Sequence, residues 1–158
     1  MGKVEVLQEK RYSRSLAKGL LAGLIGGLAA TAARSIVEKL YPPRTHGEPD
    51  QAEKITGHEL VVSEKRAAED AVHWGFGAMT GAAYGALAEY YPSATVKDGA
   101  GFGMALNSLT HGTALPAMGL SAEPENLTFR EKTSGMATHL VFGVVTETVR
   151  RFVRKMLG

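Results

Sequence analysis

The sequence predicts an all-α fold in which four helices form a transmembrane bundle. Four stretches are rich in small apolar residues, carry almost no charge and are bounded by charged residues; they cover residues 19–33, 71–88, 99–122 and 133–146. A helix needs roughly 20 mostly apolar residues to cross about 30 Å of hydrocarbon. Two stretches come close to that length or exceed it, and the other two reach it when the Lys and Arg side chains beside them snorkel.

Composition excludes several classes of protein. The chain has 158 residues, enough for one domain. It contains no cysteine, which excludes disulfides and thiolate metal sites. The net charge is only +2, and the basic residues gather at the two ends of the chain rather than along a stripe with interleaved aromatics. We therefore expect no nucleic-acid partner.

Helix breakers and capping residues set the boundaries of the four predicted helices. Pro42 and Pro43 end the first helix, because proline lacks a backbone donor and restricts the residue before it. Ser63 is the expected N-cap of the second helix, Pro92 follows its end, and Pro116 kinks or ends the third. The helices are therefore expected at residues 13–41, 64–91, 96–115 and 129–156.

The four spans are expected to form a single membrane domain of residues 1–158. They are predicted at residues 15–40, 66–91, 97–119 and 131–154. A polar outer loop over residues 42–62, with a short helical turn at 51–56, joins the first two spans. Lys and Arg gather at both termini, and cytoplasmic flanks are enriched in these residues, so both termini are expected in the cytoplasm.

Two of the predicted helices carry glycine at every fourth position. The two stripes consist of Gly19, Gly23 and Gly27, and of Gly77, Gly81 and Gly85. A stripe of small residues lets the backbone of another helix approach closely. The simplest expectation is that the two stripes pack on each other within the chain.

Short motifs occur along the chain in a fixed order. They are Tyr41-Pro42-Pro43-Arg44, His73, Ala88-Glu89-Tyr90-Tyr91-Pro92, His111, Pro116-Ala117-Met118-Gly119-Leu120, Glu131, His139-Leu140-Val141, Glu147 and Arg150-Arg151. With them the chain resembles the YagU-like family of bacterial inner-membrane proteins. It departs from that family in a shorter first loop, and in Leu127-Thr128-Phe129 where a Trp-rich stretch would stand. The resemblance implies a multi-pass protein of the bacterial inner membrane and implies no reaction.

Several ionisable and polar groups fall within the predicted spans, in the outer half of the bilayer. They are His73, His111, His139, Arg34, Glu38 and Asn107. Ionisable groups inside a membrane are costly and suggest a function by default, and histidine titrates near physiological pH. Three hypotheses follow: a structural cluster bonded across helices, a proton-responsive or proton-conducting site, and a metal or haem site. No two of these histidines lie four residues apart on one helix, so metal ligation has no specific support and no cofactor is expected.

The members of this cluster are expected to face the interior of the bundle. A histidine that faces lipid leaves a ring nitrogen unsatisfied in hydrocarbon. At least two of the three histidines should therefore share a water, an ion or a hydrogen bond. Arg34 precedes Glu38 by one turn, which is the less favourable order for an ion pair. Pairs between helices, Glu38 with His73 and Arg34 with Asp70, are therefore expected to be more favourable than the pair of Arg34 and Glu38 along one helix.

The opposite end of the predicted bundle is basic. Glu147 lies one turn before Arg151, and the simplest expectation is an i,i+4 ion pair near the cytoplasmic surface. Glu89 is expected at the same level, at the interface. Neither carboxylate is a predicted catalytic group.

The leading hypothesis is a non-enzymatic integral membrane protein of the bacterial inner membrane. Its histidine cluster would make it sensitive to pH, with a role in envelope or acid stress. One alternative is an accessory subunit that docks on a larger membrane complex, or on a second copy of itself, through faces of Gly and Ala. Another is a small metal- or haem-binding membrane protein that uses the three histidines. Lipid is the one partner that the sequence predicts directly.

Overall fold

The computed structural model describes residues 14–42, 57, 62–119 and 124–158, and every regular element in those ranges is a helix. The all-α class predicted from the sequence is confirmed for this part of the chain. The main helices are α1 (Leu16–Leu40), α3 (Val62–Tyr90), α4 (Ala100–Leu109) and α6 (Phe129–Met156). The predicted loop over 42–62, with its helical turn at 51–56, lies almost wholly outside the described residues.

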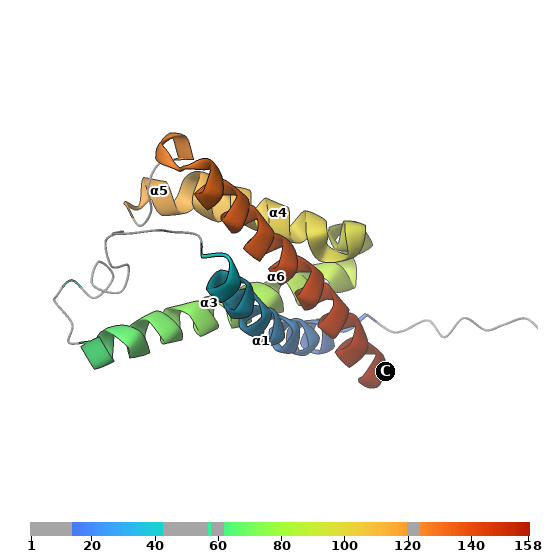
Figure 1. The fold of residues 1–158 in the computed structure, drawn as a ribbon. Coiled ribbons are helices and arrows are strands. Elements are labelled where there is room, and N and C mark those ends of the chain that lie inside the picture. Colours follow the sequence, from blue (N-terminus) through green and yellow to red (C-terminus); the bar gives the residue numbers. More distant parts are fainter. Residues whose placement is uncertain (1–13, 43–56, 58–61, 120–123) are drawn as a thin grey trace, which may run out of the picture.

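Helix α1 is the centre of the arrangement. It packs along both α3 and α6, whereas α4 packs mainly on α6 and α3 barely touches α6 (Figure 1). Each of these helix pairs is antiparallel: Ser15 at the start of α1 bonds Glu89 at the end of α3, and Tyr41 bonds Ser134 near the start of α6. The starts of α1 and α4 and the ends of α3 and α6 therefore lie at one end of the bundle.

The two predicted glycine stripes meet at the contact between α1 and α3. A Cβ added at Gly23 would collide with the carbonyl oxygen of Gly81, and one added at Gly27 would collide with that of Gly77. At Gly19 the added carbon would lie 2.8 Å from the carbonyl oxygen of Gly85. The two backbones are in direct contact, so no larger residue fits at these positions without separating the helices.

A second small-residue face of α1 packs on α6. Ala22 and Ala30 are fully buried there, and a Cβ added at Gly26 would lie 2.6 Å from the carbonyl oxygen of Thr146. Helix α4 meets α6 in the same way, through Gly103 against the backbone of His139. Small residues thus set the spacing at all three helix contacts.

Small and polar residues fill the buried positions of this bundle. Of the residues that the structure describes, five hydrophobic ones are buried, three of them alanines, against nine polar or charged ones. Within the part of the chain whose side chains are described, no Leu, Ile, Val or Met is buried. These side chains lie on the outside instead; Met79 in the middle of α3 is 72% exposed.

Local capping explains where α1 and α6 begin. The Ser15 hydroxyl accepts a hydrogen bond from the backbone N–H of Lys18. Thr128 and Glu131 form a reciprocal capping box, which starts α6 at the residue predicted from the sequence. Ser63 is not the N-cap that the sequence suggested, because α3 already begins at Val62.

The third helix starts later than predicted and does not stop at its proline. A 3₁₀ segment, Pro92–Gly99, precedes α4, and within it Lys97 and Asp98 both have φ of 54°, so the helix cannot begin at residue 96. Beyond α4 the chain makes a π-helical turn, Thr110–Ala114, and continues into α5 (Leu115–Ala117). Pro116 lacks an N–H and crowds the carbonyl of the preceding turn, and the wider π turn relieves that crowding.

Alanine at Gly23, with alanine at Gly75 as the matched control, tests the close contact of α1 and α3. At Gly23 the added methyl group must push the helices apart, and overpacking of this kind costs about 1–3 kcal/mol. At Gly75 no atom lies within 4 Å of the added carbon, so the better helix propensity of alanine should stabilise the protein by up to about 1 kcal/mol. Thermal unfolding should give a lower midpoint for Gly23→Ala only. Equal midpoints for the two variants would contradict the contact.

Candidate functional site

Two of the three predicted histidines lie together between α4 and α6. His139 is only 1% exposed, and its Nδ1 lies 2.8 Å from the carbonyl oxygen of Gly135, one turn earlier in α6. His111, in the π turn, meets it edge-on, with the ring centroids 5.1 Å apart and an interplanar angle of 84°. Asn107 lies one turn before His111, and its side-chain oxygen faces Gly135. The structure thus brings together three members of the predicted cluster.

The carbonyl of Gly135 determines which nitrogen of His139 carries the proton. A carbonyl oxygen only accepts, so Nδ1 must donate to it, and in the neutral ring Nε2 is then an acceptor. A second proton on Nε2 would create a buried cation. The charge of Arg34, on α1, acts on this ring, as does that of His111 when it is protonated. The geometry therefore favours the neutral form of His139.

The rest of the predicted cluster lies between α1 and α3. His73 Nε2 is 3.3 Å from the Ser35 hydroxyl, across the two helices. Arg34 pairs with Glu38 along α1, with Nε 2.7 Å from Oε1. Arg34 and Glu38 thus form the i,i+4 pair that was expected to be the less favourable one, while the charges of Glu38 on α1 and of Asp70 on α3 still act on His73.

A metal site would need the three histidines to converge, and they do not. Within residues 14–42, 62–119 and 124–158, no three His, Asp or Glu side chains come together in an arrangement that could hold a metal ion. His111 and His139 are neighbours, and His73 is bonded to a different helix pair.

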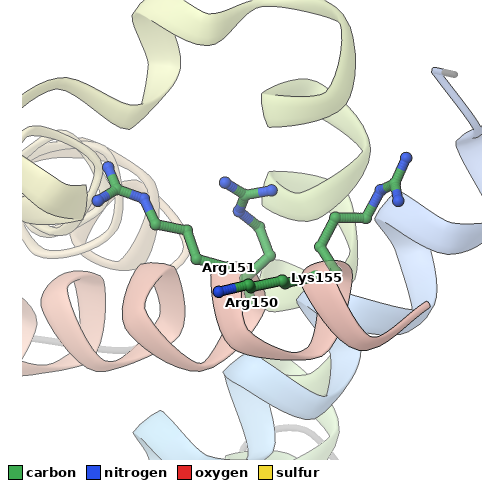
Figure 2. Close-up of a pocket in the computed structure, with 4 residues that line it drawn as sticks. Arg150, Arg151 and Lys155 are labelled. Carbon is green, nitrogen blue, oxygen red and sulfur yellow. The ribbon is translucent and has the colours of Figure 1, made fainter. Parts of the chain in front are cut away.

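The other end of the bundle holds an open pocket of about 310 Å³ along four basic side chains, whose carbon stems form most of its walls (Figure 2). The residues are Arg150, Arg151, Arg154 and Lys155, all on the last turns of α6. Among the residues that the structure describes, no other element contributes to the lining.

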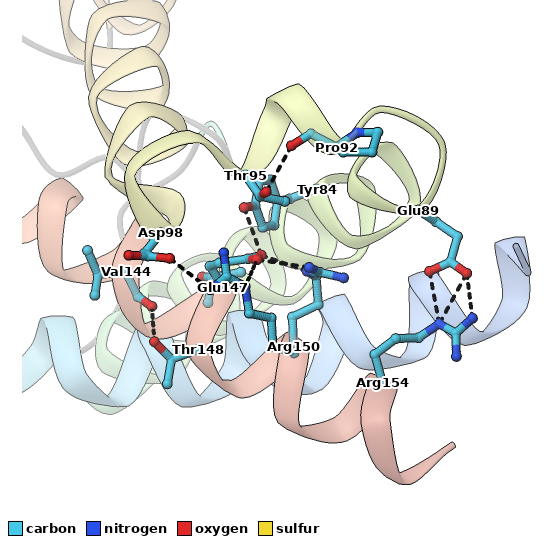
Figure 3. A network of polar contacts seen from close by, with 12 residues as sticks. Tyr84, Glu89, Pro92, Thr95, Asp98, Val144, Glu147, Thr148, Arg150 and Arg154 are labelled. Carbon is cyan, nitrogen blue, oxygen red and sulfur yellow. Dashed lines mark hydrogen bonds and ion pairs between the residues drawn. The ribbon is translucent and has the colours of Figure 1, made fainter. Parts of the chain in front are cut away.

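Glu147 lies beneath these arginines, at the centre of what we call the carboxylate network: Tyr84, Asp98, Glu147, Arg150 and Arg151 (Figure 3). Its side chain is 1% exposed. Arg150 donates to both carboxylate oxygens, over 2.7 and 2.9 Å. Arg151 donates over 2.5 Å, and the Tyr84 hydroxyl donates over 2.8 Å from α3. The predicted pair of Glu147 and Arg151 exists, but the carboxylate is buried and has two further donors.

Two more contacts extend the polar system at this end. Arg151 also reaches Asp98 of the 3₁₀ segment, over 2.7 Å. Glu89, expected at the interface, is instead held in a buried ion pair by Arg154 over 2.6 Å, and it accepts the backbone N–H of Ser15. The two carboxylates thus tie the ends of α3 and α6 to the starts of α1 and α4.

Sequence reasoning missed Tyr84 and the burial of Arg150 and Arg154. Tyr84 has no ionisable neighbour at helical spacing, so nothing local indicates its partner. Arg150 and Arg154 are four residues apart and share one face of α6, as do Glu147 and Arg150 at a spacing of three. That periodicity was the available signal that the basic run has a buried side.

A family model matches residues 28–148. The chain belongs to the DUF1440 family. This family is described as a protein of unknown function, and comparisons with curated proteins and with solved structures found no match. The DUF1440 match includes the histidines and Glu147, and it ends before Arg150.

In this DUF1440 protein, Glu147→Gln should be far more damaging than Asp98→Asn. Each variant removes one negative charge from the same network. Loss of the Glu147 charge leaves the buried Arg150 uncompensated, which typically costs about 3–5 kcal/mol. Asp98 is 72% exposed, and its pair with Arg151 should contribute about 0–1 kcal/mol.

Denaturant unfolding of the two purified variants beside the unmodified chain would measure this difference. A loss of stability that is the same for both would contradict a buried network centred on Glu147.

Proposed function

We propose that this DUF1440 chain is an integral, multi-pass membrane protein whose four helices span the lipid bilayer. One observation carries the proposal: the side chains are arranged inside out relative to a soluble protein. Soluble proteins bury Ile, Val and Leu most often and almost never bury Glu or Arg. Here Glu147, Arg150 and Arg154 are buried, while the large aliphatic side chains face outward.

This arrangement agrees with the physics of helices in lipid. Hydrocarbon is as apolar as leucine, so large apolar side chains gain nothing by turning inward. Small residues at the contacts and polar side chains that bond across helices hold such bundles together, and ionisable groups face the interior. The contacts of α1 with α3 and α6 have this character throughout.

Helix lengths give partial support. Among the described helices, α1 alone is both long and apolar enough to cross a membrane by composition. Its 25 residues extend about 37 Å at about 1.5 Å per residue. In α3, the run from 71 to 88 contains no acidic residue, lysine or arginine and extends about 27 Å. Lys and Arg side chains beside this run can extend their charged groups to the membrane surface, and a helix of this length then spans the hydrocarbon.

Cysteine labelling tests the membrane placement, because the natural chain contains no cysteine. Met79 and Met156 are both 72% exposed, but Met79 lies in the middle of α3 and Met156 at the end of α6. In intact membranes, a charged maleimide should label Met156→Cys and leave Met79→Cys unlabelled, because lipid would cover position 79. After denaturation both should label. Equal labelling of the two variants in native membranes would refute the proposal.

We further propose that the protein has no catalytic activity and that its histidine cluster makes the bundle sensitive to pH. The paired rings of His111 and His139 support this role, because a neutral buried histidine must take up charge in acid. The resemblance to YagU-like proteins supports a place in the bacterial inner membrane, and the Lys and Arg residues at both ends of the chain support cytoplasmic termini. The role in envelope or acid stress follows from the proposed response to pH and stays a prediction.

The detergent-solubilised protein should lose thermal stability as the pH falls from 8 to 5. The folded state disfavours a charge on His139, which lies near Arg34 and His111, whereas the unfolded chain accepts the proton freely, so acid favours unfolding. His139→Gln should flatten this dependence by removing the buried imidazole whose charge the folded state disfavours, and the midpoint at pH 8 gives the cost of the substitution itself. His73→Gln removes the less buried ring bonded to Ser35 and should remove a smaller part of the dependence. A midpoint that does not change with pH would overturn the role in pH sensing.

The accessory-subunit alternative needs a face of small residues left open in the monomer. The glycines of both stripes are instead occupied by contacts within the chain. Purification of the tagged protein from native membranes distinguishes the two ideas, since a stable partner in defined proportion would favour the alternative.

A further inference from the structure

We propose that the basic end of α6 is a binding site for the phosphate headgroup of an anionic phospholipid. The site consists of the open pocket along Arg150, Arg151, Arg154 and Lys155 (Figure 2). Lys97 belongs to the same end of the bundle, because its neighbour Asp98 bonds Arg151. The inference rests on the proposed membrane placement, which gives this end of the bundle a bilayer surface to meet.

Charge balance at this end leaves cations to spare. The carboxylates of Glu89, Asp98 and Glu147 each pair with an arginine of α6. Among the residues that the structure describes, no carboxylate pairs with Lys97 or with Lys155, and both are exposed. The network neutralises its own arginines, and the two lysines remain to attract an anion.

The two lysines flank the same arginine. Lys97 directly precedes Asp98, whose carboxylate holds Arg151, and Lys155 follows Arg151 by one helical turn. Lys97 has a φ of 54°, a backbone conformation that non-glycine residues rarely adopt. Both lysines therefore belong to the part of the bundle where Arg151 bonds Asp98, and Lys155 is itself one of the residues along the pocket.

Apolar side chains beside the pocket favour a lipid over a small soluble anion. Phe152 and Met156 of α6 and Tyr91 after α3 are all strongly exposed at this end. A phospholipid presents a phosphate next to hydrocarbon, so cations next to exposed aromatic and aliphatic groups complement both parts of it. Basic pockets on the cytoplasmic side of membrane helices commonly bind anionic headgroups.

Lipid titration of the purified full chain in detergent tests the site. The thermal midpoint is followed as phosphatidylglycerol or the zwitterionic phosphatidylcholine is added, because a ligand that binds the folded state raises the midpoint with concentration. Phosphatidylglycerol should stabilise the protein more strongly. The double variant Lys97→Gln/Lys155→Gln should weaken the apparent affinity for it by about thirtyfold, since each lysine near an anionic surface contributes about fivefold.

The double variant Lys39→Gln/Lys132→Gln is the matched control. It removes two exposed lysines from the opposite end of the bundle, and Lys39, like Lys155, lies in the last turn of its helix. Its affinity should stay within twofold of the unmodified chain. All substituted lysines are exposed, so both double variants should fold, and their midpoints without lipid check this.

Three results would overturn the inference. They are equal stabilisation by the two lipids, equal loss in the two double variants, and stabilisation by inorganic phosphate that matches phosphatidylglycerol at the same concentration. The last result would assign the pocket to a soluble anion. Failure of the membrane placement is recognised separately, by maleimide labelling at position 79, which does not depend on the lysines.

Discussion

Direct backbone contact between α1 and its two neighbours is the constraint on which the rest of the structure depends. Gly23 and Gly27 bring α1 against α3, and Gly26 brings it against α6. At that spacing no room remains for a large side chain where α1 meets α3 and α6. The large aliphatic side chains do not reach the interior, which holds alanine, threonine, serine, the rings of Tyr84 and Phe142 and a few ionisable groups. The inverted distribution of side chains is therefore a consequence of the glycine contacts.

The same constraint places the buried ionisable groups toward the two ends of the bundle. The middle of α1 offers only small residues, so no buried charge finds a partner there. Toward one end, Glu147 and Glu89 draw on arginines of α6 and connect the ends of all four main helices. Toward the other, His139 bonds the backbone of its own helix and meets His111. The first end is thus tied together by ion pairs between helices, whereas at the second the ion pair of Arg34 and Glu38 stays within α1 and the histidines make contacts between helices.

The sequence predicts well those features that depend on short-range signals. Helix α6 begins and ends where expected, because Thr128 and Glu131 cap its start locally. Features that depend on tertiary partners were missed or misplaced. The left-handed backbone at Lys97 follows no propensity of lysine, and the bond from Tyr84 to Glu147 joins residues 63 positions apart in the chain. Spacing likewise predicts that Glu147 can reach Arg151, but it carries no information on how deeply the pair is buried.

The contrast between the two ends explains why a response to pH belongs at the histidines. Arginine keeps its proton at every pH at which proteins function, so Arg150 and Arg154 hold their charge throughout the physiological range. Their positive charge is a fixed property of that end, suited to a permanent contact with an anionic surface. Histidine changes charge within the same range. An acid shift therefore lowers stability around His139, where the folded state disfavours an added proton, and leaves the charge of the basic end unchanged. The sensing and the anchoring that we propose can thus operate independently.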